Sequence, residues 1–82
     1  MKCIITREEK LIQYPDKKFV YFDYIGKERR TIISPSVLTY LKIDNISVGD
    51  VVNIQKTIRQ NKESYFITKI FLNNSNNTGD NL

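Results

Sequence analysis

The sequence of 82 residues predicts an all-β fold with one short helix, arranged as a small barrel of five to six strands. Apolar and β-branched residues alternate with polar ones through most of the chain, which is the period of strands. Turn-forming residues separate these segments at Pro15, Gly26, Gly49 and Asn61. Only residues 35–42 have helical spacing. The length allows one domain with a small core, predicted to span residues 1–72.

The first region contains two short apolar runs, Lys2–Thr6 and Lys10–Tyr14. Arg7-Glu8-Glu9 between them forms either a tight turn or a bulge in one long, bent strand, so the predicted strand number is five or six. Tyr14-Pro15-Asp16-Lys17 is a predicted turn, because proline presets φ and aspartate accepts a local hydrogen bond.

Residues 18–33 predict a hairpin that is rich in aromatic side chains. A Gly26-Lys27 turn would pair Ile25 with Glu28, Asp23 with Arg30, Tyr21 with Ile32 and Phe19 with Ser34. Since side chains alternate across a strand, Val20, Phe22 and Tyr24 share one face, and Phe19 and Tyr21 share the other. The second face also carries Asp23, Glu28 and Arg30, so we expect Phe19 and Tyr21 to point outward and Phe22 to lie in the core.

A short helix is predicted over Pro35–Lys42, with Ser34 as its N-cap and proline at its first position. Its buried stripe is Val37, Leu38 and Leu41, with Tyr40 on the opposite side. Strands at 51–59 and 64–72 follow, joined by a Gln60–Glu63 loop that pairs Arg59 with Ser64. Tyr65, Ile67 and Phe71 are expected on the core side. Residues 73–82 have one apolar side chain and are predicted to form a disordered tail.

Three strands, a helix and two further strands within about 70 residues is the element order of the OB-fold, which this sequence resembles. In that fold the first strand is long and bent, which would accommodate residues 2–14. An SH3-like barrel is the alternative, and it would lack a real helix at 35–42.

A second resemblance covers about a third of the chain. Arg30-Thr31-Ile32-Ile33-Ser34-Pro35, Val37-Leu38, Leu41 and Val48-Gly49-Asp50-Val51-Val52 follow one another as an apolar strand, a proline, a short helix and a Gly-Asp turn into a strand. This order is similar to that of the swapped-hairpin transition-state regulators of the AbrB type. The resemblance implies a dimer that binds duplex DNA.

Composition argues against several classes of activity. The chain has no histidine and a single cysteine, Cys3, so the commonest general base and a cysteine-based zinc site are missing. No catalytic pair of carboxylates and no glycine-rich phosphate loop stands out. We therefore predict a protein that is not an enzyme and has no cofactor or metal. No apolar run is long enough to span a membrane, which predicts a cytoplasmic protein with no membrane partner.

The net charge of +4 and the aromatic hairpin together predict binding of single-stranded DNA or RNA. Rings would stack on bases, while Lys and Arg would neutralise phosphates. The candidate binding residues are Lys18, Phe19, Tyr21, Lys27, Arg29, Arg30, Arg59, Lys62 and Phe66. The alternative is a protein-interaction or oligomerisation module that docks through an apolar outer face of Phe19, Tyr21, Ile32, Phe66 and Ile70.

Overall fold

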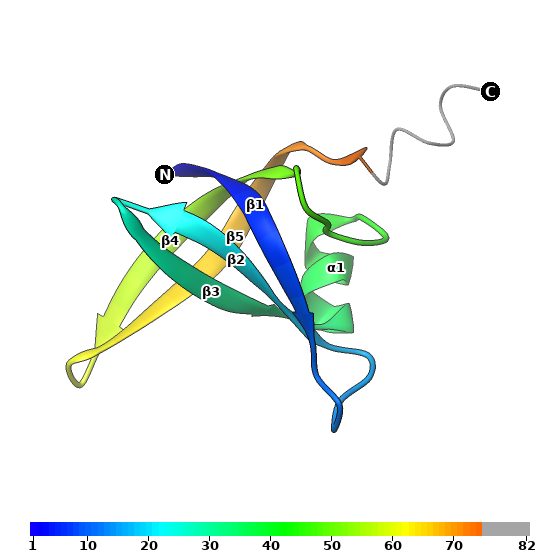
Figure 1. Cartoon of the computed structure of the whole chain (residues 1–82), viewed down its shortest axis with the longest axis horizontal. Helices are drawn as coiled ribbons and strands as arrows, with labels where there is room; N and C mark the ends of the chain where they lie inside the picture. The colour runs from blue at the N-terminus through cyan, green and yellow to red at the C-terminus, as the bar shows by residue number, and fades with distance from the viewer. Residues whose placement is uncertain (75–82) are drawn as a thin grey trace.

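The computed structural model describes residues 1–74 and consists of a five-stranded antiparallel sheet with one short helix (Figure 1). The elements are β1 (Lys2–Lys10), β2 (Lys18–Tyr24), β3 (Lys27–Ile33), α1 (Pro35–Leu41), β4 (Val51–Arg59) and β5 (Lys62–Leu72). The strand order is β3-β2-β1-β4-β5. The prediction of an all-β fold with one helix is confirmed. The sheet is open, since no backbone ladder within residues 1–74 joins β3 to β5. No helix in this part of the chain has the length and apolar character needed to cross a bilayer.

β1 is one long strand with an irregularity between Ile5 and Arg7, where its pairing with β2 changes register. This confirms the bulge and bent-strand alternative. The expected strand over Lys10–Tyr14 is wrong. Beyond Lys10 the chain leaves the sheet, and the side chain of Ile12 is fully exposed. The predicted turn at Pro15 is present, with the amide of Lys17 donating to the carbonyl of Tyr14 at 2.9 Å.

The β2–β3 hairpin turns at Ile25-Gly26 and not at Gly26-Lys27. Both turn residues have positive φ, 51° and 77°, as a two-residue turn of type I′ requires. Tyr24 therefore pairs with Lys27, and Tyr21 faces Arg30 in place of the expected Ile32. The predicted register was therefore wrong by two residues. A shift of two residues leaves every side chain on the same face of the sheet. Val20 and Phe22 are accordingly fully buried, as predicted.

The β4–β5 hairpin has a similar two-residue turn, at Gln60-Asn61, which pairs Arg59 with Lys62 and not with Ser64. The pairing is irregular at two places further along: Ile54 faces Ile67 but Asn53 faces Lys69, and Val52 faces Ile70 but Val51 faces Leu72. The extra residue of β5 at the first place reverses the alternation of its side chains. The prediction that Phe71 points to the core is therefore wrong: its side chain is exposed.

The core lies between the two halves of the bent sheet, and α1 covers one end of it (Figure 1). The buried core residues are Cys3, Ile5, Val20, Phe22, Ile33, Ile46, Val52, Ile54, Tyr65 and Ile67. The Ser34 side chain caps α1 by accepting from the amide of Val37 at 3.4 Å. Val37, Leu38 and Leu41 pack against the core, as predicted, but they are only partly buried, and Tyr40 is exposed.

A buried carboxylate fixes the end of β5. Asp50 is 0% exposed and accepts hydrogen bonds from the amide of Ser47 at 3.0 Å and from Nδ2 of Asn73 at 2.8 Å. The amide of Asn74 donates to its other oxygen at 3.0 Å. The prediction of a tail that begins at residue 73 is wrong for these two residues, because Asn73 is buried. The rest of the predicted tail, 75–82, lies outside the described residues.

Candidate functional site

A groove of about 800 Å³ runs between β3, α1 and the β4–β5 hairpin. Ile32 of β3, Tyr40 of α1 and Phe66 of β5 contribute to its walls, and Phe19 of β2 reaches it as well. Gln55 and Thr57 of β4 and several small polar residues complete the lining. Of the described residues that line the groove, only Arg30 is charged. The surface is therefore an aromatic and apolar trough with one fixed cation.

The groove continues into a second hollow beside the β1–β2 loop. Phe19 and Ile32 line both hollows, so the two hollows adjoin at these side chains. The second hollow adds Tyr14, with the ammonium of Lys17 5.1 Å from the centre of its ring, and also Lys10. The rings of Phe66, Tyr40 and Phe19 thus line the groove, and the rings of Phe19 and Tyr14 line the second hollow.

Arg30 is held in place by its neighbours on β1 and β2. Its Nη1 donates to the hydroxyl of Tyr21 at 3.3 Å and lies 3.7 Å from a carboxylate oxygen of Glu9. Its guanidinium carbon lies 4.0 Å from the centre of the Phe19 ring. About half of the Arg30 side chain remains exposed. The guanidinium thus presents its free face and unused N–H groups to the groove.

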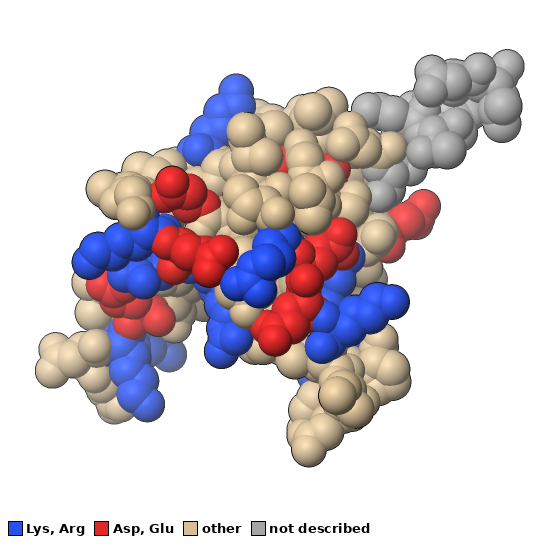
Figure 2. Space-filling view, in the orientation of Figure 1, with Lys and Arg blue, Asp and Glu red and all other residues tan. Residues whose placement is uncertain are grey.

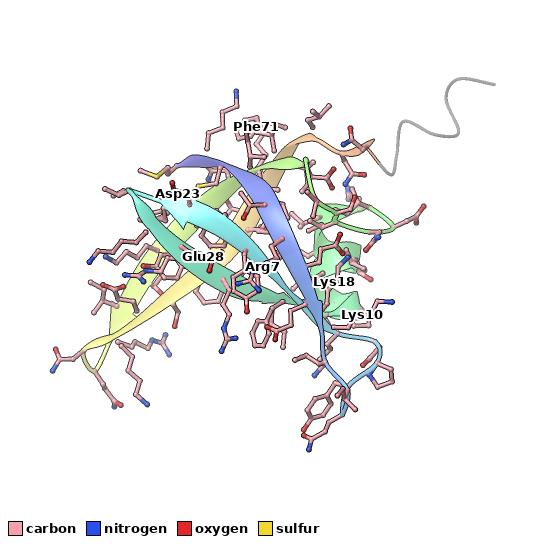
Figure 3. The ribbon with its side chains drawn as sticks, viewed as in Figure 1. Arg7, Lys10, Lys18, Asp23, Glu28 and Phe71 are labelled. Atoms are coloured by element: carbon pink, nitrogen blue, oxygen red, sulfur yellow. The ribbon has the colours of Figure 1, made fainter. Side chains whose placement is uncertain are left out.

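Tyr21 is on the predicted face of the sheet, but its ring is only 8% exposed, so the expectation of an open stacking ring is wrong. The guanidinium carbon of Arg7 lies 3.6 Å from the ring centre, and the hydroxyl donates to Glu9. Arg7 in turn forms an ion pair with Glu28 at 3.1 Å (Figure 3). Side chains of β1 therefore cover this face of β2, which the hairpin alone could not reveal.

Two of the predicted phosphate-binding cations are used inside the protein. The ammonium of Lys18 donates to Glu8, to the Asn45 side chain at 2.9 Å and to the carbonyl of Ile46, and its side chain is only 15% exposed (Figure 3). Burial opposes ionisation of the Glu8 carboxyl, yet the hydrogen bond and charge of Lys18 hold its pKa below the usual value. Lys18 is thus a tie between β2, β1 and the loop before β4.

Arg29 is directed toward the core-side edge of β5. Its Nε donates to the hydroxyl of Tyr65 at 3.1 Å, and that hydroxyl donates to Glu63 at 2.8 Å. Lys56 completes the cluster with an ion pair to Glu63 at 3.1 Å. The hydrogen bonds from Tyr65 and Lys56 lower the pKa of Glu63 below its usual value. Arg29 therefore joins β3 to β5 and is a weak candidate for phosphate contact.

The remaining predicted cations are at the turns. Lys27 follows the β2–β3 turn, and Arg59 faces Lys62 at the tip of the β4–β5 hairpin. All three are exposed, and within residues 1–74 none forms an ion pair with a carboxylate. These turns differ from the face of β1, β2 and β3, where Figure 2 shows basic and acidic groups interspersed.

The structure thus brings together three of the nine predicted residues, Phe19, Arg30 and Phe66, in one groove. Sequence reasoning left Tyr14, Lys10 and Tyr40 out of the candidate site. The helical spacing already placed Tyr40 on the exposed side of the helix, and an exposed ring was the one indication that it could belong to a binding site. Only the fold shows that this side of the helix faces Phe66.

Comparison of the chain with protein-family models, with curated proteins and with solved structures finds no match. The groove, its rings and the charges around it are therefore the basis for a functional proposal.

Proposed function

We propose that this chain is a non-enzymatic protein that binds single-stranded DNA or RNA in the groove between β3, α1 and β5. The observation that carries the proposal is the set of rings that line two adjoining hollows, Phe66, Tyr40, Phe19 and Tyr14, with the Arg30 guanidinium against Phe19. Aromatic side chains stack on bases of any sequence, each contributing about 1–3 kcal/mol. We expect binding with weak sequence preference.

The arrangement of the strands supports the same interpretation. The order β3-β2-β1-β4-β5, with a helix between β3 and β4, is that expected of an OB-type barrel in which β3 and β5 would meet. The side chain of Thr31 donates to the carbonyl of Tyr65 at 2.7 Å across that gap. OB-folds bind oligonucleotides on the face of their second and third strands and between the β1–β2 and β4–β5 loops. The groove lies beside β3, one of these strands, and Phe19 of β2 reaches it.

The charges suit a polyanion at both ends of the groove. Lys10 and Lys17 flank the hollow at the β1–β2 loop, and Arg59 and Lys62 occupy the tip of the β4–β5 hairpin. Cations at these positions neutralise phosphates without reading sequence, while the apolar middle of the groove accommodates bases. Lys18 is not among the proposed phosphate-binding residues, because its ammonium already donates to groups of the protein.

The test is a fluorescence-anisotropy titration with labelled oligothymidine, oligouridine and a duplex at two salt concentrations. Phe66→Ala should weaken binding of the single strands by about 1–3 kcal/mol, the contribution of one stacked ring. Ile58→Ala is the matched control: both side chains are exposed on the same hairpin, 51% and 63%, but only Phe66 lines the groove. The control should bind like the parent protein.

The salt dependence separates the charges from the rings. Replacing Arg59 and Lys62 by glutamine should make the slope of log affinity against log salt shallower, by up to about 0.7 for each phosphate that the variant no longer neutralises. Two results would contradict binding of single strands in the groove. One is an equal loss of affinity in Phe66→Ala and Ile58→Ala. The other is an affinity for duplex equal to that for single strands, which neither variant changes. The second result would favour the duplex-binding alternative.

One observation favours a second candidate function. The groove lies between β3 and β5, the two edge strands of the sheet. Unpaired strand edges beside an apolar trough can accept an extended peptide by strand addition. A partner protein or a second copy of this chain would bind there with little salt dependence. Sedimentation of the protein alone measures whether two copies associate. A dimer in this measurement, together with failure of every oligonucleotide to bind, would identify the case of a second copy.

A further inference from the structure

A second exposed aromatic ring lies at the other end of β5 from the hairpin tip. Phe71 is 47% exposed, with the ammonium of Lys2 5.1 Å and that of Lys69 5.3 Å from its ring centre. Figure 3 shows it at the top of the molecule, away from both loops that border the groove. Neither lysine forms an ion pair with a carboxylate within residues 1–74. A ring between two such cations combines the two groups that bind a nucleotide, a stacking surface and phosphate partners.

The irregular pairing of β5 is what places Phe71 outside. Between the Ile54–Ile67 pair and the Asn53–Lys69 pair, β5 has one residue more than β4, and Phe71 is a second extra residue, between the Val52–Ile70 and Val51–Leu72 pairs. Regular alternation from Phe66 would direct residue 71 to the opposite face, but the first extra residue restores it to the outer side. Ile70 packs against the core in its place. Bulges of this kind re-aim single side chains, and they occur beside binding sites.

The outer face of β4 connects the groove to this ring. Gln55 and Thr57 line the groove, and Asn53 is the next residue on the same face. Asn53 pairs in register with Lys2 on β1 and with Lys69 on β5, so the two lysines flank it. At a rise of about 3.3 Å per residue, Thr57 and Asn53 are about 13 Å apart along the strand. The Asn53 amide donates to the Thr68 hydroxyl at 2.7 Å and accepts from the N-terminal ammonium of Met1 at 3.0 Å, so hydrogen bonds on both sides orient this side chain.

We infer that Phe71, Lys2 and Lys69 form a second contact site for a single strand that leaves the groove past Phe66 and follows the outer face of β4 and β5. This inference rests on the proposed function and extends it. The groove alone binds a short oligonucleotide, and a longer one also stacks a base on Phe71 and places phosphates on Lys2 and Lys69. The protein therefore gains affinity with length beyond what the groove supplies.

The experiment compares oligothymidines of about 6 and about 15 nucleotides, which lie near the lower and upper ends of the usual site sizes of single OB-type domains. Phe71→Ala should weaken binding of the longer oligonucleotide at least about fivefold, the equivalent of one stacked base. Binding of the shorter one should stay unchanged. Leu72→Ala is the matched control, since it removes an exposed apolar side chain from the next position of the same strand. Thermal unfolding of each variant checks that the fold is retained.

Phe71→Leu and a double replacement of Lys2 and Lys69 by glutamine refine the result. The leucine variant should lose as much affinity as the alanine variant, because it retains apolar area but has no ring. The lysine variant should show a shallower salt slope with the longer oligonucleotide only. An unchanged affinity of Phe71→Ala for the longer oligonucleotide, or an equal loss at both lengths, would overturn the inference.

The outcomes also separate this inference from the proposal for the groove. If Phe66→Ala weakens both lengths and Phe71→Ala weakens neither, the groove binds single strands and the second contact site is refuted. If neither variant changes binding of any oligonucleotide, the proposed function itself fails and this inference fails with it.

Discussion

Replacing Asp50 by asparagine should destabilise the domain by about 2–4 kcal/mol, because a carboxylate that satisfies three donors would become an amide with a single acceptor oxygen. Asp50 is 0% exposed. One of its oxygens accepts from the Ser47 amide and the Asn73 side chain, and the other accepts from the Asn74 amide. The substitution changes no volume, so its effect isolates these hydrogen bonds.

The magnitude follows from the hydrogen bonds that remain. Asparagine can turn its carbonyl toward Ser47 and Asn73, but its NH₂ group then faces the donor at Asn74. One charge-assisted hydrogen bond is lost, which costs about 1.5–3 kcal/mol, and the other two become weaker neutral ones. A domain of this size has a total stability of only about 4–12 kcal/mol. The variant should therefore be clearly less stable, with its melting temperature lowered by about 4–8 °C for each kcal/mol.

Urea unfolding followed by circular dichroism measures the change. Asp44→Asn is the control, since Asp44 is an exposed carboxylate in the same loop and its replacement should stay within about 0.5 kcal/mol. Asn73→Ala should destabilise as well, and the Asp50 and Asn73 changes should be less than additive when combined. If Asp50→Asn and Asp44→Asn have the same small effect, the carboxylate does not hold the end of β5, and the reasoning is refuted.

Ile25→Asn should stabilise the domain by about 1 kcal/mol, because an exposed β-branched residue occupies φ 51° in a turn that favours Asn-Gly; a lower urea midpoint would contradict this. Tyr21→Ala should cost about 3 kcal/mol of stability, the low end for a buried aromatic residue, since flexible side chains cover its ring. An unchanged midpoint would show that the ring is open to solvent after all. The pKa of Glu63 is lowered in the folded state, so its contribution to stability is complete above the ordinary glutamate value of about 4.3 and is lost as pH falls through the folded value. Glu63→Gln should flatten the acid limb of the stability curve, and an identical limb would count against the cluster.

Periodicity and turn chemistry in the sequence were enough to predict the elements. Alternation, proline and the Ser34 cap are local properties, and they predicted the 18–33 hairpin, the helix at 35–42 and the strands at 51–59 and 64–72, which correspond to β2, β3, α1, β4 and β5. The identity of the core face of β2 was also predicted. This prediction is correct although the turn was placed wrongly, because a shift of two residues preserves the alternation of side chains.

The binding surface was predicted only in part, for a reason that Tyr21 and Phe71 illustrate. Tyr21 is covered by Arg7 and Glu9, which are distant in sequence and arrive through the β1–β2 pairing. Phe71 faces outward where the pairing of β4 with β5 is irregular, with one extra residue of β5 before Lys69 and Phe71 itself as a second. Neither effect leaves a local pattern that can be read before the strands are paired.

The sequence by itself determined the class of fold, the positions of most of its elements, the core side of the first hairpin and a basic chain rich in rings. Only the tertiary structure decided which of these groups act together. It joins Lys18 to the carbonyl of Ile46 and the buried Asp50 to Asn73, and it gathers Phe19, Arg30, Tyr40 and Phe66 around one groove. The physical reason is that secondary structure depends on contacts between near neighbours, whereas exposure and site geometry depend on which distant strands pair and in what register.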